Sequence, residues 1–407
     1  MFLSSRIKNT NLSLTLKMNE RAQDLHDSGV HVYNLTSGQL PFKPIPELNA
    51  KIISQVNFLK SFQYSPPSGF PELKEKVLKY MESSRGINLP REKFDCIVSN
   101  GAKHSIYNAL GAMVDPGDEV VIVAPYWISY PEMIKFWGGV PIVVTTKSYN
   151  AFVPDIDELR KVLTSRTKML ILNSPNNPSG VNYSEHWMDE FANLMQEFPD
   201  TLILSDEIYY DLFYYDPKPT YYYQNRIELL DRTLIVDGIS KTQMGPGLRL
   251  GYCVGPKKII DAMTLIQSQT TSGPSSLIQR ALIELDWSKN VEFLTPIKTY
   301  LRRNADALRE AFKNEGLDNC WYQTTGAFYF MVDFSITPCF SLYKKDDNDQ
   351  KDYSIQICDD LLKDECVAII PGSDFGLKNS ARISLTLEKE PFEAAMEKLT
   401  HFLSKEK

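Results

Sequence analysis

The chain contains 407 residues, of which 43% are hydrophobic and 23% are charged, and its formal net charge is −7 at pH 7. This composition is typical of a folded protein with a large interior, and the length exceeds the roughly 250–300 residues at which single hydrophobic cores stop growing, so we expect two domains. The acidic balance argues against a nucleic-acid partner, and the lack of a long apolar run or secretory signal leads us to expect a cytoplasmic protein without membrane contact.

The middle of the chain alternates short apolar runs with longer amphipathic segments. Near-continuous Val, Ile and Leu runs are typical of strands buried on both faces of a sheet, and the segments between them have helical spacing. The predicted strands are 119–124, 140–144, 168–172, 201–204 and 233–236, and helices are predicted at 156–163 and 186–198. Because helical crossovers join parallel strands, we expect an α/β fold with a large domain whose mostly parallel sheet lies between helices.

After about residue 285 the pattern changes to a mixture of long helices and isolated strands. Helices are predicted at 291–314, 355–363 and from Pro391, and strands at 328–334, 367–370 and 382–385. This mixture predicts a smaller α+β domain formed by the two chain ends. We expect residues 1–46 to form an N-terminal arm and part of that domain, 47–285 the large domain, and 286–407 the small C-terminal domain.

Polar side chains follow the predicted strands at the sheet edge where ligands of α/β proteins bind. Ser240 and Lys241 follow one strand, and Arg249 comes eight residues after the lysine. This pairing resembles the cofactor lysine of a pyridoxal phosphate enzyme, in which a lysine amine holds the aldehyde in a Schiff base and an arginine binds the phosphate, although a lone lysine after a serine would mean little.

Other strand ends carry the remaining groups that this chemistry needs. Asp206 could face the pyridine nitrogen of the cofactor, although a surface acid that caps a helix is the alternative. Tyr209 and Asn177 could donate to the ring oxygen, although the segment around Asn177 is also typical of a plain turn. Trp127 could stack on a flat heterocycle or simply belong to the core.

Two further features suggest anion-binding groups. Gly101, Ala102 and Lys103 precede an apolar helical pattern, and the N–H groups at the start of a helix accept phosphate readily. Arg382 begins a predicted strand in the small domain, where it could bind a carboxylate with two hydrogen bonds or could be solvated. Scattered cysteines and histidines give no metal-binding spacing, so we expect no metal.

Taken together, the residues resemble a class I aminotransferase of the fold-type I pyridoxal phosphate family, over about residues 19–403. The stretches most similar to the bacterial aspartate aminotransferase subgroup are Tyr64-Ser-Pro-Pro-Ser-Gly69, Gly101-Ala-Lys103, Asp115-Pro-Gly-Asp-Glu119, Ala124-Pro-Tyr-Trp-Ile-Ser-Tyr-Pro-Glu132, Asn173-Ser-Pro-Asn-Asn-Pro-Ser-Gly180 and Ser205-Asp-Glu-Ile-Tyr209. The resemblance implies a ping-pong enzyme that takes the amino group of aspartate, gives it to 2-oxoglutarate, and releases oxaloacetate and glutamate.

The resemblance also implies a role for each site residue. Lys241 would carry the cofactor, Asp206 would face its ring nitrogen, Asn177 and Tyr209 its ring oxygen, Trp127 its ring face, and Arg249, Ser240 and the amides of Gly101, Ala102 and Lys103 its phosphate. Gly38 and Arg382 would bind the substrate's α-carboxylate, with Trp127 and Asn177 beside it, and Lys103 is the candidate for the distal carboxylate. Tyr64 would reach the phosphate of the neighbouring subunit, which implies a homodimer with shared active sites.

Four departures from the family pattern concern substrate choice. The segment Gly38-Gln-Leu-Pro-Phe42 replaces the usual Gly-Glu-Pro-Asp-Phe, Pro246-Gly-Leu-Arg249 replaces Thr-Gly-Trp-Arg, Gly238 stands where some branches have serine, and Asn11 stands where a basic residue accompanies prephenate use. An aminotransferase for aromatic or neutral amino acids and a lyase of the same fold are therefore alternatives. A non-catalytic pyridoxal phosphate-binding regulator is a third.

Overall fold

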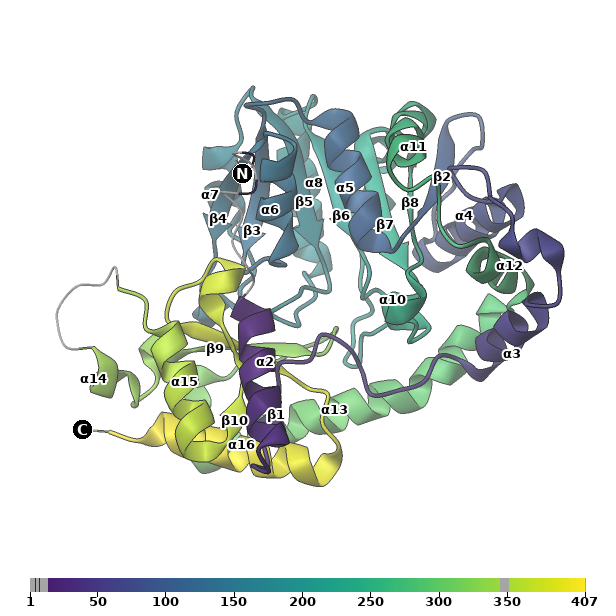
Figure 1. Cartoon of the computed structure of the whole chain (residues 1–407). Helices are drawn as coiled ribbons and strands as arrows, with labels where there is room; N and C mark the ends of the chain where they lie inside the picture. Colours follow the sequence, from purple (N-terminus) through teal and green to yellow (C-terminus); the bar gives the residue numbers. More distant parts are fainter. Residues whose placement is uncertain (1–3, 5–6, 8–13, 345–350, 407) are drawn as a thin grey trace.

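A seven-stranded sheet forms the centre of the larger part of the molecule (Figure 1). The computed structural model describes residues 4, 7, 14–344 and 351–406, so Asn11 lies outside the described residues. In the order β2-β8-β7-β6-β5-β3-β4, every neighbouring pair is parallel except the two pairs that involve β8. The strands are β2 Phe94–Ser99, β3 Glu119–Ala124, β4 Val140–Thr145, β5 Thr167–Asn173, β6 Leu202–Asp206, β7 Thr233–Gly238 and β8 Gly251–Pro256.

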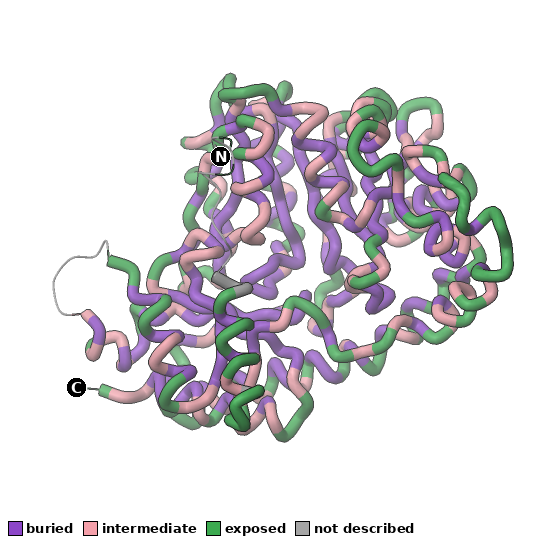
Figure 2. Tube along the Cα trace, in the orientation of Figure 1, coloured by how far each residue is buried: buried purple, intermediate pink, exposed green. Residues whose placement is uncertain are grey.

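Helices cover both faces of this sheet, which is buried between them (Figures 1 and 2). The alternation along β3 shows why: Val120 and Ile122 pack toward α5, α6 and α11, whereas Val121 and Val123 pack toward α4, α8 and α12. The helices of this part are α3 Pro46–Gln55, α4 Pro71–Arg85, α5 Ala102–Met113, α6 Ser129–Phe136, α7 Ile156–Val162, α8 Glu185–Glu197, α9 Tyr222–Asn225, α10 Ile239–Thr242, α11 Lys257–Thr270 and α12 Ser276–Glu284.

The five strands predicted from apolar runs are confirmed as β3 to β7, but β2 and β8 were not predicted. β8 has the sequence Gly-Tyr-Cys-Val-Gly-Pro, and glycine and proline normally argue against a strand. Here the glycine is required, because a Cβ on Gly251 would lie 2.2 Å from the backbone nitrogen of Ala102. The sheet can therefore approach the start of α5 closely only at a residue without a side chain.

The two chain ends meet in the smaller part of the molecule. β1 (Tyr33–Asn34) pairs with β10 (Val367–Ala368), and a separate three-stranded antiparallel sheet has the order β11-β12-β9. Figure 1 shows the N-terminal α2 beside the C-terminal α15 and β10. The remaining elements are β9 Tyr329–Asp333, β11 Ile370–Pro371, β12 Ser380–Ser384, α2 Leu14–Asp27, α13 Asn290–Asn314, α14 Phe340–Tyr343, α15 Ser354–Glu365 and α16 Lys389–Ser404.

The prediction of one strand over 367–370 is wrong. The strand is interrupted at Ile369, so that β10 pairs with β1 in one sheet and β11 pairs with β12 in another. Residues 367–370 are all fully buried, and an uninterrupted apolar run carries no signal for the point at which a chain leaves one sheet for the next. The domain boundaries at residues 46 and 285 stay a prediction.

Candidate active site

A cavity of about 360 Å³ lies beyond the carboxyl ends of β5, β6 and β7. Eleven of the predicted site residues line it: Gly38, Ala102, Lys103, Trp127, Asn177, Asp206, Tyr209, Ser240, Lys241, Arg249 and Arg382. Gly101 immediately precedes α5 and contacts Arg249 from outside this lining. Tyr64 is separate from the cavity and is 93% exposed.

The amine of Lys241 faces this cavity from the short helix α10, directly after β7. It donates a hydrogen bond to the carbonyl oxygen of Gly38 at 2.6 Å and lies 5.1 Å from the ring centroid of Phe328. Loss of solvation, reinforced by the positive charge of Arg382, lowers the pKa of Lys241 to about 7, although Asp206 opposes the shift. A sizeable fraction of the amine is therefore neutral and nucleophilic at neutral pH.

Asp206 ends β6 and is 4% exposed. Its Oδ2 accepts a hydrogen bond from the Tyr130 hydroxyl at 2.5 Å, and its Oδ1 accepts one from the N–H of Ile208 at 3.3 Å. Burial raises the pKa of Asp206 to about 6, while the hydrogen bond from Tyr130 acts in the opposite direction. The alternative of a surface acid capping a helix is wrong, because the side chain is buried and residues 207–221 form no helix.

Arg382 reaches the cavity from β12 in the small sheet. Its Nη2 donates to the carbonyl oxygen of Thr36 at 2.8 Å and its Nη1 to Oδ1 of Asn177 at 3.3 Å. Its buried Nε has no hydrogen-bond partner among the described residues. A buried guanidinium with a spare donor and no carboxylate partner in the described part of the chain has the properties that an anion-binding group needs.

A second group of cations lies where α5 begins. Gly101 has a φ of +84°, and a Cβ there would lie 2.8 Å from Nη2 of Arg249. Arg249 donates only to the backbone oxygens of Pro246 and Asn100, at 3.0 and 3.3 Å, among the residues described. The first N–H groups of a helix have no intrahelical acceptor, so this corner combines them with a guanidinium that has no acidic partner.

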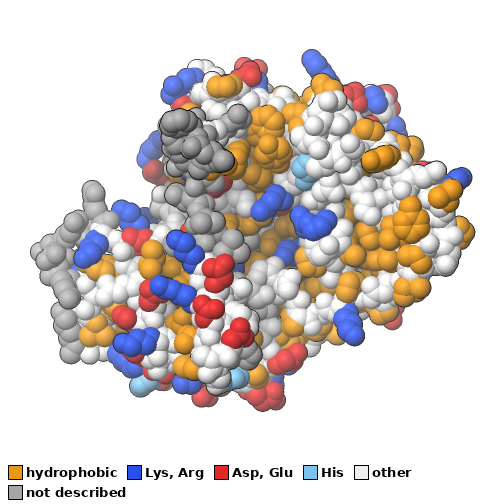
Figure 3. All heavy atoms as spheres, viewed as in Figure 1, with side chains coloured by type: hydrophobic (Ala, Val, Ile, Leu, Met, Phe, Trp, Pro, Cys, Tyr) orange, Lys and Arg blue, Asp and Glu red, His pale blue; other side chains and the backbone are white. Residues whose placement is uncertain are grey.

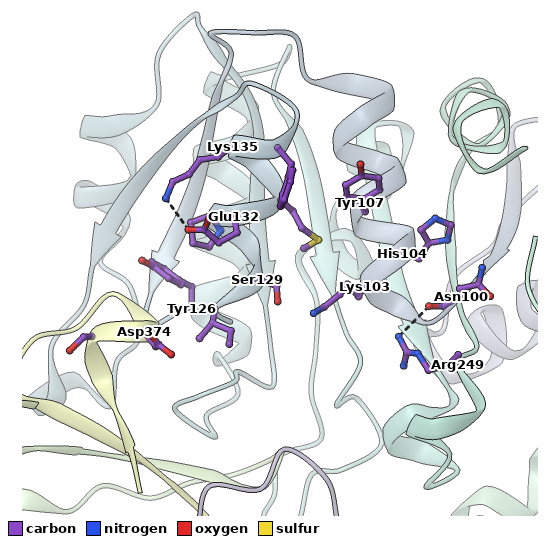
Figure 4. A pocket seen from close by; sticks show the side chains of 15 residues that line it. Asn100, Lys103, His104, Tyr107, Tyr126, Ser129, Glu132, Lys135, Arg249 and Asp374 are labelled. Carbon is purple, nitrogen blue, oxygen red and sulfur yellow. Dashed lines mark hydrogen bonds and ion pairs between the residues drawn. The ribbon is translucent and has the colours of Figure 1, made fainter. Parts of the chain in front are cut away.

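Lys103 extends from α5 into the space between α5 and α6 (Figure 4). Its amine lies 4.8 Å from the ring centroid of Trp127, and it forms no ion pair with any described carboxylate. Burial, together with the nearby charge of Arg249, lowers the pKa of Lys103. Lys103 and Arg249 also line an adjoining cavity of about 660 Å³, whose walls include Tyr107, Tyr126 and the ion pair between Lys135 and Glu132 (Figure 4).

Three residues of the site were missing from the prediction. Tyr130 binds Asp206; Asn173 donates to the carbonyl oxygen of Asp206 at 2.9 Å and accepts from the N–H of Asn177 at 2.8 Å; and the Tyr329 hydroxyl lies 3.3 Å from that of Tyr209. Tyr130 and Asn173 fall within the quoted motifs, so a search of those motifs for further hydrogen-bonding side chains could have found them. Tyr329 gave no such signal, because a tyrosine in a predicted strand is usually part of the core.

Within the described ranges, no group of three or more His, Cys, Asp and Glu residues could hold a metal ion. No helix of the described chain combines the length and apolar character that a membrane crossing requires.

Comparisons with known proteins cover almost the whole chain. Residues 30–399 match the family described as aminotransferase class I and II. The chain is 33% identical over 406 residues to the aspartate/prephenate aminotransferase of Thermus thermophilus and 32% identical over 403 residues to the aspartate aminotransferase of Geobacillus stearothermophilus, with 99% of each chain covered in both cases. Both relatives therefore match along essentially their entire length.

Solved structures of aspartate aminotransferases have the same fold as this chain. The aspartate aminotransferase of Thermus thermophilus with maleate superposes with a TM-score of 0.88 at 32% identity, covering 99% of this chain and 100% of that one. The aspartate aminotransferase of Rhizobium meliloti gives 0.87 at 29% identity and covers 98% of each chain. These matches confirm the predicted α/β fold, and the chain belongs to the class I and II aminotransferases, a family of enzymes that use pyridoxal 5'-phosphate.

Proposed function

We propose that this enzyme transfers the amino group of aspartate to 2-oxoglutarate by a ping-pong mechanism, giving oxaloacetate and glutamate. The observation that carries the proposal is the presence of two separate cations, Arg382 and Lys103, that line the Lys241 cavity without an acidic partner among the described residues. A dicarboxylic substrate carries two anions and needs a cation for each. Aspartate is also the substrate named for the relatives from Thermus and Geobacillus.

The residues around the cavity fit pyridoxal phosphate. A lysine amine with a pKa of about 7, a buried carboxylate, and a cationic corner that only a glycine at position 101 leaves open are the groups this cofactor needs. In this proposal Lys241 would bind the aldehyde carbon, Asp206 the pyridine nitrogen, Asn177 and Tyr209 the ring oxygen, Trp127 the ring face, and Arg249, Ser240 and the amides of Gly101, Ala102 and Lys103 the phosphate. When bound, the cofactor supplies an electron-accepting ring for the electron pair of the substrate Cα.

The chain's own residues manage the protons and the substrate. When its amine is not bound to the cofactor, Lys241, with a pKa of about 7, can take a proton from the substrate Cα and return it at neutral pH. Asp206, ionised above about pH 6, favours a proton on the pyridine nitrogen, and Tyr130 holds the carboxylate in place. Arg382 and the backbone of Gly38 bind the α-carboxylate, and Lys103 binds the distal one.

One observation favours a second candidate function. The cavity adjoining Lys103 is larger than the site itself and includes Tyr107, Tyr126 and Phe136 in its walls. Aromatic walls suit an aromatic side chain, so an aminotransferase for aromatic or neutral amino acids is the alternative. A lyase of the same fold would eliminate a β or γ substituent from its amino acid and release that substituent, ammonia and an oxo acid without an amino acceptor, so dependence of turnover on 2-oxoglutarate separates it from both.

The exposed position of Tyr64 supports a homodimer with shared sites. Ile53, Phe58, Leu59 and Phe62 are each more than half exposed on the neighbouring surface, between 55% and 75%. Figure 3 shows hydrophobic side chains gathered at the end of the molecule where α3 lies. A surface of this kind marks an interaction site. We propose that a second copy covers it and that Tyr64 completes the phosphate site of that copy.

The substrate proposal predicts that Lys103→Ala lowers kcat/KM for aspartate by about 10- to 150-fold, because a charge-assisted hydrogen bond contributes about 1.5–3 kcal/mol. Activity on alanine and phenylalanine should change far less. The measurement is initial rates over a panel of amino donors with 2-oxoglutarate. If Lys103→Ala lowers kcat/KM equally for all donors, or if the wild type prefers phenylalanine, the enzyme is instead an aminotransferase for aromatic or neutral amino acids.

Replacing Asp206 by asparagine should retain the fold and the bound cofactor while lowering kcat at least about 100-fold. The amide has the same shape but cannot favour a proton on the pyridine nitrogen through its charge. Circular dichroism and cofactor content verify that the protein is intact, and stopped-flow or steady-state rates give the loss. Near-normal turnover would show that Asp206 has only a structural role.

The lowered pKa of Lys241 predicts how the stability of the cofactor-free protein depends on pH. Between about pH 7 and 10.5 the unfolded chain holds a proton that the folded lysine has lost, so the lysine's contribution to the free energy of unfolding rises with pH, by at most about 1.4 kcal/mol per unit. In urea titrations, the free energy of unfolding of the wild type relative to Lys241→Met should be larger at pH 9.5 than at pH 7.5. Lys79→Met, at a side chain 71% exposed, is the control. Parallel curves for wild type and Lys241→Met would refute the lowered pKa.

Shared sites predict complementation between two defective chains. Lys241→Ala should be inactive, and Tyr64→Ala should bind the cofactor about tenfold more weakly through loss of a phosphate contact. Each mixed dimer contains one site with both residues intact, so at cofactor concentrations that leave the Tyr64→Ala dimer largely unloaded, mixing should restore up to about half of the wild-type activity per hybrid. An active monomer by light scattering, or no recovery in verified hybrids, would contradict the proposal.

A further inference from the structure

A buried arginine outside the cavity joins the strand that carries Asp206 to the strand that leads to Lys241. Arg85 is the last residue of α4, and its side chain is fully buried. Its Nε donates to Glu207 Oε2 at 3.0 Å and its Nη2 to Asp237 Oδ2 at 2.9 Å, and both carboxylates are also fully buried. Arg85 does not line the cavity, so no part of the proposed chemistry uses it directly.

The two carboxylates occupy the points where the strands end. Glu207 directly follows Asp206, and its side chain leaves the chain on the opposite side from the cavity. Asp237 lies four residues before Lys241, at the end of β7. Backbone pairing between β6 and β7 stops at the hydrogen bond from Glu207 N–H to the Val236 oxygen, at 2.8 Å. Beyond that bond, the two strand ends are linked through side chains, because Arg85 binds both Glu207 and Asp237.

Each member of this cluster is held by further bonds. Glu207 Oε1 accepts from the hydroxyls of Tyr223 at 2.7 Å and Ser205 at 2.8 Å, and Asp237 Oδ1 accepts from the N–H of Gly238 at 2.6 Å. The guanidinium lies 3.5 Å from the ring centroid of Tyr210. Burial raises the pKa of Glu207 and raises that of Asp237 to about 7, and the Arg85 charge opposes both shifts. The cluster therefore leaves little freedom for either strand end.

Stability alone does not account for such a cluster. Removing water from one cation and two carboxylates costs about as much as their attraction returns, so apolar residues of similar volume often stabilise a fold equally well. A planar guanidinium that donates to two carboxylates holds those carboxylates at a fixed separation. Reacting groups need such fixed separation, because a displacement of about 1 Å can lower a rate about 100-fold.

We propose that Arg85 is a positioning residue that sets the spacing between Asp206 and Lys241 by binding Glu207 and Asp237 together. The inference rests on the proposed roles of Asp206 and Lys241. Arg85 contacts neither of them; it acts through the residue after Asp206 and through the segment that leads to Lys241.

The test removes all three charges at once, so that no buried charge remains unpaired. The variant is Arg85→Met with Glu207→Gln and Asp237→Asn. Arg91 supplies a matched control six residues along the chain: it also pairs with two carboxylates, Glu75 and Glu82 at 2.9 Å each, but it is 37% exposed and does not line the cavity. Its control variant is Arg91→Met with Glu75→Gln and Glu82→Gln, which makes the same change in charge.

Both triple variants are measured as holoenzymes, with the best amino donor of the panel and 2-oxoglutarate. The Arg85 variant should lower kcat about 10- to 100-fold while KM changes less than about threefold, and it should shift the midpoint of the pH titration of the bound cofactor's visible absorption by about one unit or more. Arg85→Lys keeps the charge but cannot bind two carboxylates through one planar group. It should change kcat and the titration midpoint less than the triple variant does. The control variant should alter neither quantity.

The proposal is overturned if the Arg85 variant changes only the melting temperature, or if both triple variants lower kcat and shift the titration equally. If the triple variant does not fold, Arg85→Lys decides, because wild-type kcat and an unshifted midpoint in that variant would refute the positioning role. If wild type transaminates no donor, the proposed function fails on its own, and the absorption midpoint still tests Arg85. If borohydride reduction attaches the cofactor to a lysine other than Lys241, both proposals fall.

Discussion

Withdrawal of the Lys241 amine from water, next to the positive charge of Arg382, is the condition on which the chemistry of this site depends. An exposed lysine is almost wholly protonated at neutral pH and is a poor nucleophile. Here desolvation and a neighbouring cation bring the pKa to about 7, so the amine can both attack and carry a proton. The carboxylate of Asp206 counteracts the shift and keeps it moderate. The pKa of the Lys241 amine is therefore set by desolvation together with the opposing charges of Arg382 and Asp206.

The parallel sheet makes this balance possible. β5, β6 and β7 run side by side, and their carboxyl ends deliver Asn173, Asp206 and, through α10, Lys241 to one edge. Arg382 comes from the other sheet, so the cavity exists only when the chain ends pack beside the large sheet. The unpaired Nε of Arg382 supports the proposed role of this residue, because a donor that is already in place needs no reorganisation when an anionic ligand binds.

Local sequence signals predicted the parts of the molecule that depend on local pattern. Apolar runs gave β3 to β7, and polar residues directly after those runs gave Asn177, Asp206 and Lys241. Contacts between distant segments could not be obtained in this way. Nothing near Tyr130 indicates that its hydroxyl binds Asp206, 76 residues later, and nothing near Arg85 indicates that it joins Glu207 and Asp237. The glycines of β8 likewise argue against a strand until α5 is seen packed on them.

The arginines and lysines of this chain show how a cation's partners separate binding from scaffolding. Arg85 has a fully buried side chain, and each of its three nitrogens has a partner, because it donates to two carboxylates and to the hydroxyl of Ser84. Arg382 is also buried but binds only a backbone oxygen and an amide oxygen, and the described residues offer its Nε nothing. Burial alone would rank the two equally. Because an unpaired buried charge is costly, the environment of Arg382 supports the proposed anionic ligand, whereas the paired environment of Arg85 supports the proposed role in positioning its partners.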